Sequence, residues 1–93
     1  MIIAVDYDGT LKTGNEMNIA LINRLMHEQR RGNVVILWTC RNGKRLQEAC
    51  SELLQMGFRP NYVNCNSEET IRNLGYDPRK VLADIYIDDK AVR

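Results

Sequence analysis

The chain has 93 residues, a formal net charge of +1, and a composition that is 44% hydrophobic and 27% charged. This length predicts a single domain spanning residues 1–93, with a core of modest size. Basic residues are scattered along the chain, so we find no strong patch for nucleic acid or an anionic membrane. No apolar run approaches the roughly 18 residues of a membrane span, and we expect no signal peptide. The three cysteines are widely spaced, which favours a reducing, cytoplasmic location over a disulfide framework.

The first half of the chain predicts a strand, a helix and a second strand. Ile2–Asp6 and Asn33–Trp38 are nearly continuous apolar runs, typical of strands buried on both faces of a parallel sheet. Between them, Met17–Arg31 has helical periodicity, and Gly32 stands where a C-terminal glycine cap is expected. The apolar stripe of this helix consists of Ile19, Ile22, Leu25 and Met26.

The second half continues the alternation of helices and strands. A helix is predicted over Lys44–Met56, followed by a strand over Asn61–Cys65. A short helix over Ser67–Leu74 follows, with Asn66 as its expected N-cap. The last elements in order are a single helical turn at Asp77-Pro78 and a strand over Ala83–Ile87.

This alternation predicts an α/β fold, a Rossmann-like three-layer sandwich built on a short parallel sheet of about four strands. Ligands of such folds bind beyond the carboxyl ends of the strands. The residues that follow each predicted strand are therefore the candidates for a functional site.

Four carboxylates stand at two of these strand ends. Asp6 and Asp8 follow the first strand, and Asp88 and Asp89 follow the last. Residues i and i+2 of an extended chain point the same way, so Asp6 and Asp8 can face one cleft. If the two strands are neighbours, the four acids converge, and either some are protonated or a cation lies among them. Mg²⁺ suits a site with few carboxylates and room for phosphate oxygens.

Simpler interpretations exist for each motif alone. Asp8-Gly9 could begin a hairpin, although Leu11-Lys12-Thr13-Gly14 is poor strand material. A calcium-binding loop does not fit, because its first acidic position falls on Ala4. Asp88-Asp89 could be a solvated turn, and Thr39 a strand-end hydroxyl that bonds to the backbone. The case for a site rests on their coincidence at one sheet edge.

Taken together, these residues resemble the haloacid dehalogenase superfamily of phosphotransferases. The first family motif matches Asp6-Tyr7-Asp8-Gly9-Thr10, and the second, a Thr or Ser ending the second strand, matches Thr39. The third, a Lys or Arg before the last core strand, matches Lys80. The fourth, an acidic pair, matches Asp88-Asp89, so the resemblance spans Ile2 to Lys90.

The resemblance implies a role for each matching residue. Asp6 would be the nucleophile that forms an aspartyl-phosphate, and Asp8 the acid that protonates the leaving oxygen and then activates water. Mg²⁺ would be held by the Asp6 carboxylate, the Asp8 carbonyl, Asp88 and, directly or through water, Asp89. Thr39 would donate a hydrogen bond to the phosphoryl group. Lys80 would lie near Asp6 and the phosphate and keep both charged. In the turn after the strand, Gly9 would supply the sharp bend and Thr10 would brace it.

The sequence departs from the family pattern in two respects. Lys80 lies close before the acidic pair, and it has rivals as the phosphate-site cation in Arg79, Arg41 and Lys44. The intervals between the motifs leave no space for a cap domain, so we expect a minimal, capless core. A capless site suits macromolecular phosphate ends, or small substrates if a neighbouring subunit forms a lid, and exposed sheet edges favour a homo-oligomer.

The resemblance implies a Mg²⁺-dependent phosphomonoester phosphatase acting on a small phosphorylated molecule or a macromolecular phosphate. The alternative is a regulatory or binding module of the same fold that does not turn over phosphate. A cysteine phosphatase does not fit, because the required arginine position after Cys40 is Leu46. A zinc site lacks paired spacing. A receiver domain does not fit either. The acidic pair of a receiver ends the first strand, whereas the adjacent acids of this chain, Asp88 and Asp89, end the last.

Overall fold

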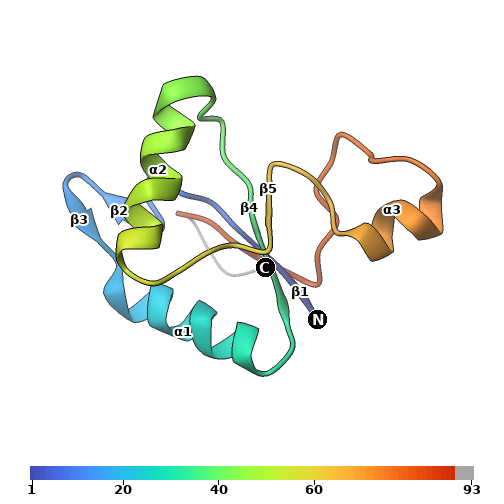
Figure 1. The fold of residues 1–93 in the computed structure, drawn as a ribbon, viewed down its shortest axis with the longest axis horizontal. Coiled ribbons are helices and arrows are strands. Elements are labelled where there is room, and N and C mark those ends of the chain that lie inside the picture. The colour runs from blue at the N-terminus through green and yellow to red at the C-terminus, as the bar shows by residue number, and fades with distance from the viewer. Residues whose placement is uncertain (90–93) are drawn as a thin grey trace.

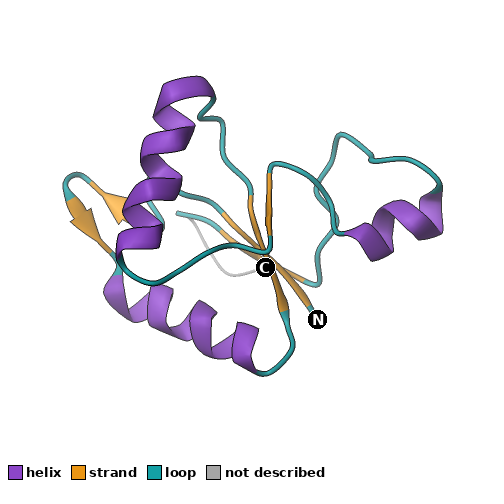
Figure 2. Cartoon of the chain, viewed as in Figure 1, coloured by secondary structure: helices purple, strands orange, loops and turns teal. Residues whose placement is uncertain are grey.

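The computed structural model describes residues 1–89, so Lys90, where the family resemblance ends, lies outside the described residues. Figure 1 shows the ribbon and Figure 2 the same view by secondary structure. The elements in chain order are β1 (Ile2–Val5), β2 (Lys12–Thr13), β3 (Glu16–Met17), α1 (Ile19–Arg30), β4 (Val34–Leu37), α2 (Gly43–Gln55), β5 (Tyr62–Val63), α3 (Glu68–Leu74) and β6 (Ile85–Ile87). Within residues 1–89, no helix combines the length and the apolar character needed to cross a membrane.

The central sheet has four strands in the order β5-β4-β1-β6. All three pairings are parallel, and β1 pairs with both β4 and β6. The predicted α/β, Rossmann-like class is therefore confirmed. The first and last core strands are neighbours, as the convergence of the four acids requires, because Ile3 is in register with Ile85 and Val5 with Ile87.

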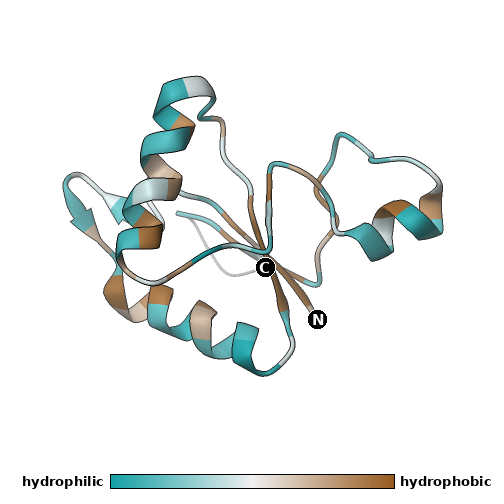
Figure 3. Ribbon diagram, in the orientation of Figure 1, coloured by the Kyte–Doolittle hydropathy of each residue, from teal (hydrophilic) through white to brown (hydrophobic). Residues whose placement is uncertain are grey.

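One face of the sheet is covered by α1 and α2. Alternate strand residues, such as the odd-numbered Ile3 and Val5 of β1, pack there in one cluster with Ile22 of α1 and Leu53 of α2. Alternation along each strand sends the next residues to the opposite face. Figure 3 colours the ribbon by residue hydropathy and shows hydrophobic residues along the central strands.

The opposite face is more thinly covered. Ala4 and Ile36 pack there against Val81, which lies in the segment that leads into β6. Helix α3 has no buried residue, and Figure 1 shows it standing away from the sheet. We call this surface the open face, because a loop segment rather than a packed helix covers it.

Several local predictions were wrong. Lys12–Thr13 does form a strand, which pairs antiparallel with Glu16–Met17 across the Gly14-Asn15 turn. Gly-Asn between two short strands is itself a hairpin signal, because Gly14 takes a positive φ of 61°. The helix therefore begins at Ile19 rather than Met17, with Asn18 as its N-cap.

The segment around α3 also differs from its prediction. Ser67, not Asn66, caps α3, since its Oγ accepts a hydrogen bond from the Thr70 amide. The Asn66 side chain instead bonds to Asp77, to the carbonyls of Pro78 and Lys80, and to the Leu82 amide. These bonds hold residues 77–82 as an irregular loop, so the predicted helical turn does not form. In the helix stripes, Ile19 and Leu54 are exposed.

Candidate functional site

Asp6 and Asp88 line one cavity at the carboxyl edge of the sheet. Asp6 directly follows β1, and its amide donates to the Ile87 carbonyl of β6 at 3.0 Å. The cavity measures about 250 Å³ and lies on the open face. Its lining residues are Ala4, Val5, Asp6, Trp38, Val81, Tyr86, Ile87 and Asp88. We call it the strand-end cavity.

Asp6 lies in an environment that opposes its negative charge. Burial raises the pKa of its carboxyl above the ordinary value, and the nearby carboxylates of Asp8, Asp89 and Asp88 raise it further. One contact acts the other way, because the Tyr7 amide donates to Asp6 Oδ1 at 2.8 Å. All four acids singled out from the sequence thus lie close enough to interact electrostatically at one place.

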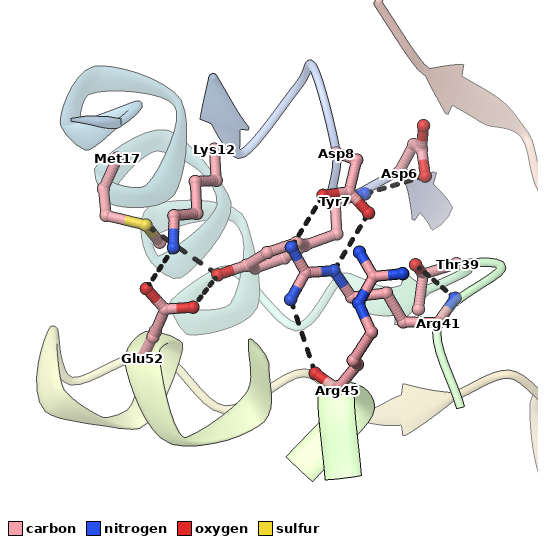
Figure 4. Close-up of polar contacts among 9 residues, drawn as sticks. All are labelled: Asp6, Tyr7, Asp8, Lys12, Met17, Thr39, Arg41, Arg45 and Glu52. Atoms are coloured by element: carbon pink, nitrogen blue, oxygen red, sulfur yellow. Dashed lines mark hydrogen bonds and ion pairs between the residues drawn. The ribbon is translucent and has the colours of Figure 1, made fainter. Parts of the chain in front are cut away.

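Asp8 lies in the opposite kind of environment. Arg41 Nε and Nη2 donate to its two carboxylate oxygens at 2.9 and 2.7 Å, in a bidentate ion pair (Figure 4). This pair, with the further positive charges of Arg45 and Lys12, lowers the pKa of Asp8. Among the described residues, Asp8 does not line the strand-end cavity. Asp6 and Asp8 are therefore adjacent in the chain but face different partners.

Thr39 follows β4 at the same carboxyl edge of the sheet. Its side chain is buried, its amide donates to Asn64 Oδ1 at 2.8 Å, and its Oγ1 accepts from the Arg41 amide at 3.1 Å. Asn64 takes a positive φ of 54°, which is uncommon for a residue other than glycine. These bonds fix the position of Thr39, while its hydroxyl proton has no acceptor within residues 1–89.

Lys80 is exposed, and its ammonium makes no ion pair within the described part of the chain. Its backbone carbonyl is fixed by Asn66 at 3.2 Å. The cation that the structure places against a site acid is Arg41, one of the rivals noted from the sequence. Arg41 also lies over the ring of Tyr7, with 4.7 Å from guanidinium carbon to ring centroid.

Tyr7 connects the site to helix α2 and the β2–β3 hairpin. Its ring is fully buried, and its hydroxyl donates to Glu52 Oε1 at 2.9 Å. Lys12 Nζ bonds to the other Glu52 oxygen at 2.6 Å. Tyr7 thus occupies the core while its two neighbours in sequence reach the site. Sequence analysis did not find this network, because no periodic pattern relates these three residues.

Gly9 sits directly against the acidic pair. Its φ is +79°, and a Cβ added there would lie 3.2 Å from the Asp89 Cβ. The turn is held by backbone bonds, including that from the Thr10 amide to the Tyr7 carbonyl at 3.2 Å. The Thr10 hydroxyl is buried and has no hydrogen-bond partner among residues 1–89, so the expected side-chain brace is not made.

The fit of a divalent metal can be judged from these acids. Residues 1–89 contain no group of three or more His, Cys, Asp or Glu side chains arranged as a metal cage. Mg²⁺ is usually bound by one or two carboxylates and substrate phosphates, and it keeps several waters. Asp6 and Asp88, which share a cavity, provide two carboxylates, and burial together with the neighbouring acids raises the pKa of Asp6. The residues therefore fit Mg²⁺ bound together with phosphate.

Comparison with known proteins gives one informative match. No family model and no curated protein matches the chain. A conserved protein from Bacteroides thetaiotaomicron, of solved structure, is 33% identical, with a TM-score of 0.79 over 98% of this chain and 77% of that one. The chain belongs to the family of this Bacteroides protein. The match covers nearly all of the present chain. It names no activity, because the Bacteroides protein is described only as conserved. The chemistry of the site must therefore be argued from its residues.

Proposed function

We propose that the protein is a Mg²⁺-dependent phosphomonoester phosphatase of the haloacid dehalogenase type. The observation that carries this proposal is the position of Asp6. It directly follows a buried parallel strand, shares a cavity with Asp88 of the neighbouring strand, and is close enough to Asp8 and Asp89 for their charges to raise its pKa. Such a concentration of acids is costly to stability and is typical of functional sites.

The Asp6 carboxylate is the proposed nucleophile. One of its oxygens attacks the phosphorus of the ester, the bond from phosphorus to the leaving oxygen breaks, and an aspartyl-phosphate forms. Asp8 supplies a proton to the leaving oxygen. Asp8 then takes a proton from water, the water oxygen attacks phosphorus, and the bond to Asp6 breaks, which releases inorganic phosphate and restores both acids.

The metal would be held by Asp6, the Asp8 backbone carbonyl, Asp88 and, directly or through water, Asp89. When bound, Mg²⁺ supplies positive charge that offsets the repulsion between a carboxylate nucleophile and an anionic phosphate. The environment of Asp6 supports this arrangement, because burial and three neighbouring acids oppose its ionised form in the absence of a cation.

Donors to the phosphoryl oxygens come from the edge formed by β4. The Thr39 hydroxyl is fixed in place and can donate its proton to a phosphoryl oxygen. Arg41 is the cation nearest to Asp8, and a phosphate can replace that carboxylate as its bidentate partner. Transfer of Arg41 to the substrate also frees Asp8 to carry a proton. Lys80 keeps the role implied by the family pattern, in the segment that leads into β6.

The second candidate function is a binding or regulatory module that does not turn over phosphate. The bidentate pair between Arg41 and Asp8 favours this second function. A carboxylate that arginine holds in its ionised form has no proton to donate to a leaving group. The two functions differ in whether a phosphorylated ligand releases Asp8 from Arg41.

The test is phosphate release from a panel of phosphate esters, with and without Mg²⁺. We expect Mg²⁺-dependent release that Asp6→Asn abolishes and that Glu48→Gln, an exposed acid of α2, leaves unchanged. If the wild-type protein releases no phosphate but binds a trifluoroberyllate complex or a phosphorylated ligand, the binding module is the better description.

A cytoplasmic location and assembly into a homo-oligomer, in which a neighbouring subunit covers the capless site, complete the proposal. Light scattering of the purified protein tests the assembly. A monomeric mass at the protein concentration used in the activity assay would contradict the proposed homo-oligomer.

A further inference from the structure

The strand-end cavity has an aromatic wall that phosphate chemistry does not require. Trp38 follows β4 and Tyr86 lies in β6, and both line the cavity together with Asp6. We propose that this cavity binds an uncharged, planar aromatic group on the leaving-group side of the phosphate ester. The inference rests on the proposed function for the phosphate half of the substrate and adds the chemical class of the other half.

The parity of the strands places these groups on one face. Ala4, Trp38 and Tyr86 all belong to the cluster of the open face, opposite the face that α1 and α2 cover. Asp6 has the same parity as Ala4, and Asp88 the same parity as Tyr86. A group bound against the open face therefore lies next to the acid that would attack phosphorus.

The two aromatic residues present different surfaces to a ligand. The Tyr86 hydroxyl donates to the Val81 carbonyl at 2.9 Å and accepts from the Ala83 amide at 3.0 Å. Its ring is therefore held in place, and its hydroxyl is already engaged. Trp38 also lines the cavity, and its indole N–H has no hydrogen-bond partner within residues 1–89.

The size and charge of the cavity limit its occupant. A volume of about 250 Å³ lies below the range of roughly 300–1,000 Å³ typical for drug-sized ligands, so the part of a ligand that enters it is no larger than a small ring system. Asp6 and Asp88 disfavour a second anionic group beside them. The remaining lining residues Ala4, Val5, Val81 and Ile87 favour an uncharged, apolar body.

The first test compares substrates with matched leaving groups. Benzyl phosphate and cyclohexylmethyl phosphate are both phosphate monoesters of uncharged primary alcohols, and they differ in whether the ring is planar. Aromatic pairing predicts a preference in kcat/KM of about two- to thirteenfold for benzyl phosphate. In Trp38→Leu this ratio falls toward one, while Trp38→Phe keeps most of it. Equal use of both esters, or preference for phosphocholine, overturns the inference.

The second test does not depend on catalysis. The chain has a single tryptophan, so fluorescence excited selectively at tryptophan reports on Trp38 alone. Benzyl alcohol should change the emission of the wild-type protein in a saturable manner, with half-saturation at a concentration about two- to thirteenfold lower than cyclohexylmethanol requires. This measurement needs no variant, so it decides the inference even if Trp38→Leu does not fold.

The outcomes separate this inference from the proposed function. A saturable change with benzyl alcohol but no phosphate release from any ester supports the aromatic site and counts against the phosphatase. Phosphate release that depends on Asp6, with no ring preference and no change in fluorescence, supports the phosphatase and overturns the aromatic site.

Discussion

Replacing Tyr7 with phenylalanine tests how the core supports the site. The substitution keeps the buried ring and removes only the hydroxyl that donates to Glu52 at 2.9 Å. A hydrogen bond to a charged group contributes about 1.5–3 kcal/mol, and the partial exposure of Glu52 favours the lower end. A loss of about 1.5 kcal/mol corresponds to a fall in Tm of about 6–12 °C for a domain of this size.

Thermal unfolding followed by circular dichroism measures this change. Tyr76→Phe is the matched control, because the Tyr76 side chain is exposed and its hydroxyl makes no hydrogen bond within residues 1–89. We expect the control to shift the free energy of unfolding by less than about 0.5 kcal/mol. If Tyr7→Phe and Tyr76→Phe melt at the same temperature, the bond between Tyr7 and Glu52 does not stabilise the site as argued.

Three further predictions concern the site and its support. Arg41→Met should lower kcat/KM for phosphate esters about 10- to 150-fold, because it removes a charged donor. Steady-state kinetics measures this change, and Lys44→Met, which alters an exposed residue of α2, should leave kcat/KM unchanged. Gly9→Ala should destabilise more than Gly14→Ala in urea titrations, because both have positive φ but only the first Cβ meets a neighbour; equal losses would contradict this reasoning. The pKa of Glu52 is lowered, chiefly by its bond from the Lys12 ammonium, so its contribution to stability is present above its ordinary value of 4.5 and is lost as pH falls through the folded value. The wild-type protein should therefore lose stability more steeply than Glu52→Gln in acid, and parallel curves from urea titrations across pH would refute the assignment.

The core of the fold could be predicted from the sequence because its strands are apolar runs separated by periodic helices. The order of these elements also fixed the carboxyl edge at which Asp6 and Asp88 lie. The hairpin formed by β2 and β3 was not predicted, because its turn is Gly14-Asn15, whereas the stronger turn signal in the sequence is Asp8-Gly9.

Contacts between distant side chains could not be predicted in the same way. The pairing of Arg41 with Asp8 depends on how the loop between β4 and α2 folds back over the edge of the sheet. The aromatic wall of the strand-end cavity depends on which face of the sheet lacks a packed helix, and α3 has no buried residue. Local patterns carry information on neither feature.

The most direct test of the account is to detect the covalent intermediate on Asp6. The wild-type protein is mixed with Mg²⁺ and a phosphate ester, quenched in acid, and digested for mass spectrometry. The account predicts a peptide containing Asp6 that carries one added phosphoryl group, which is absent without Mg²⁺ and in Asp6→Asn. Rapid phosphate release with no phosphoryl group on that peptide, or with the group on another residue, would contradict it.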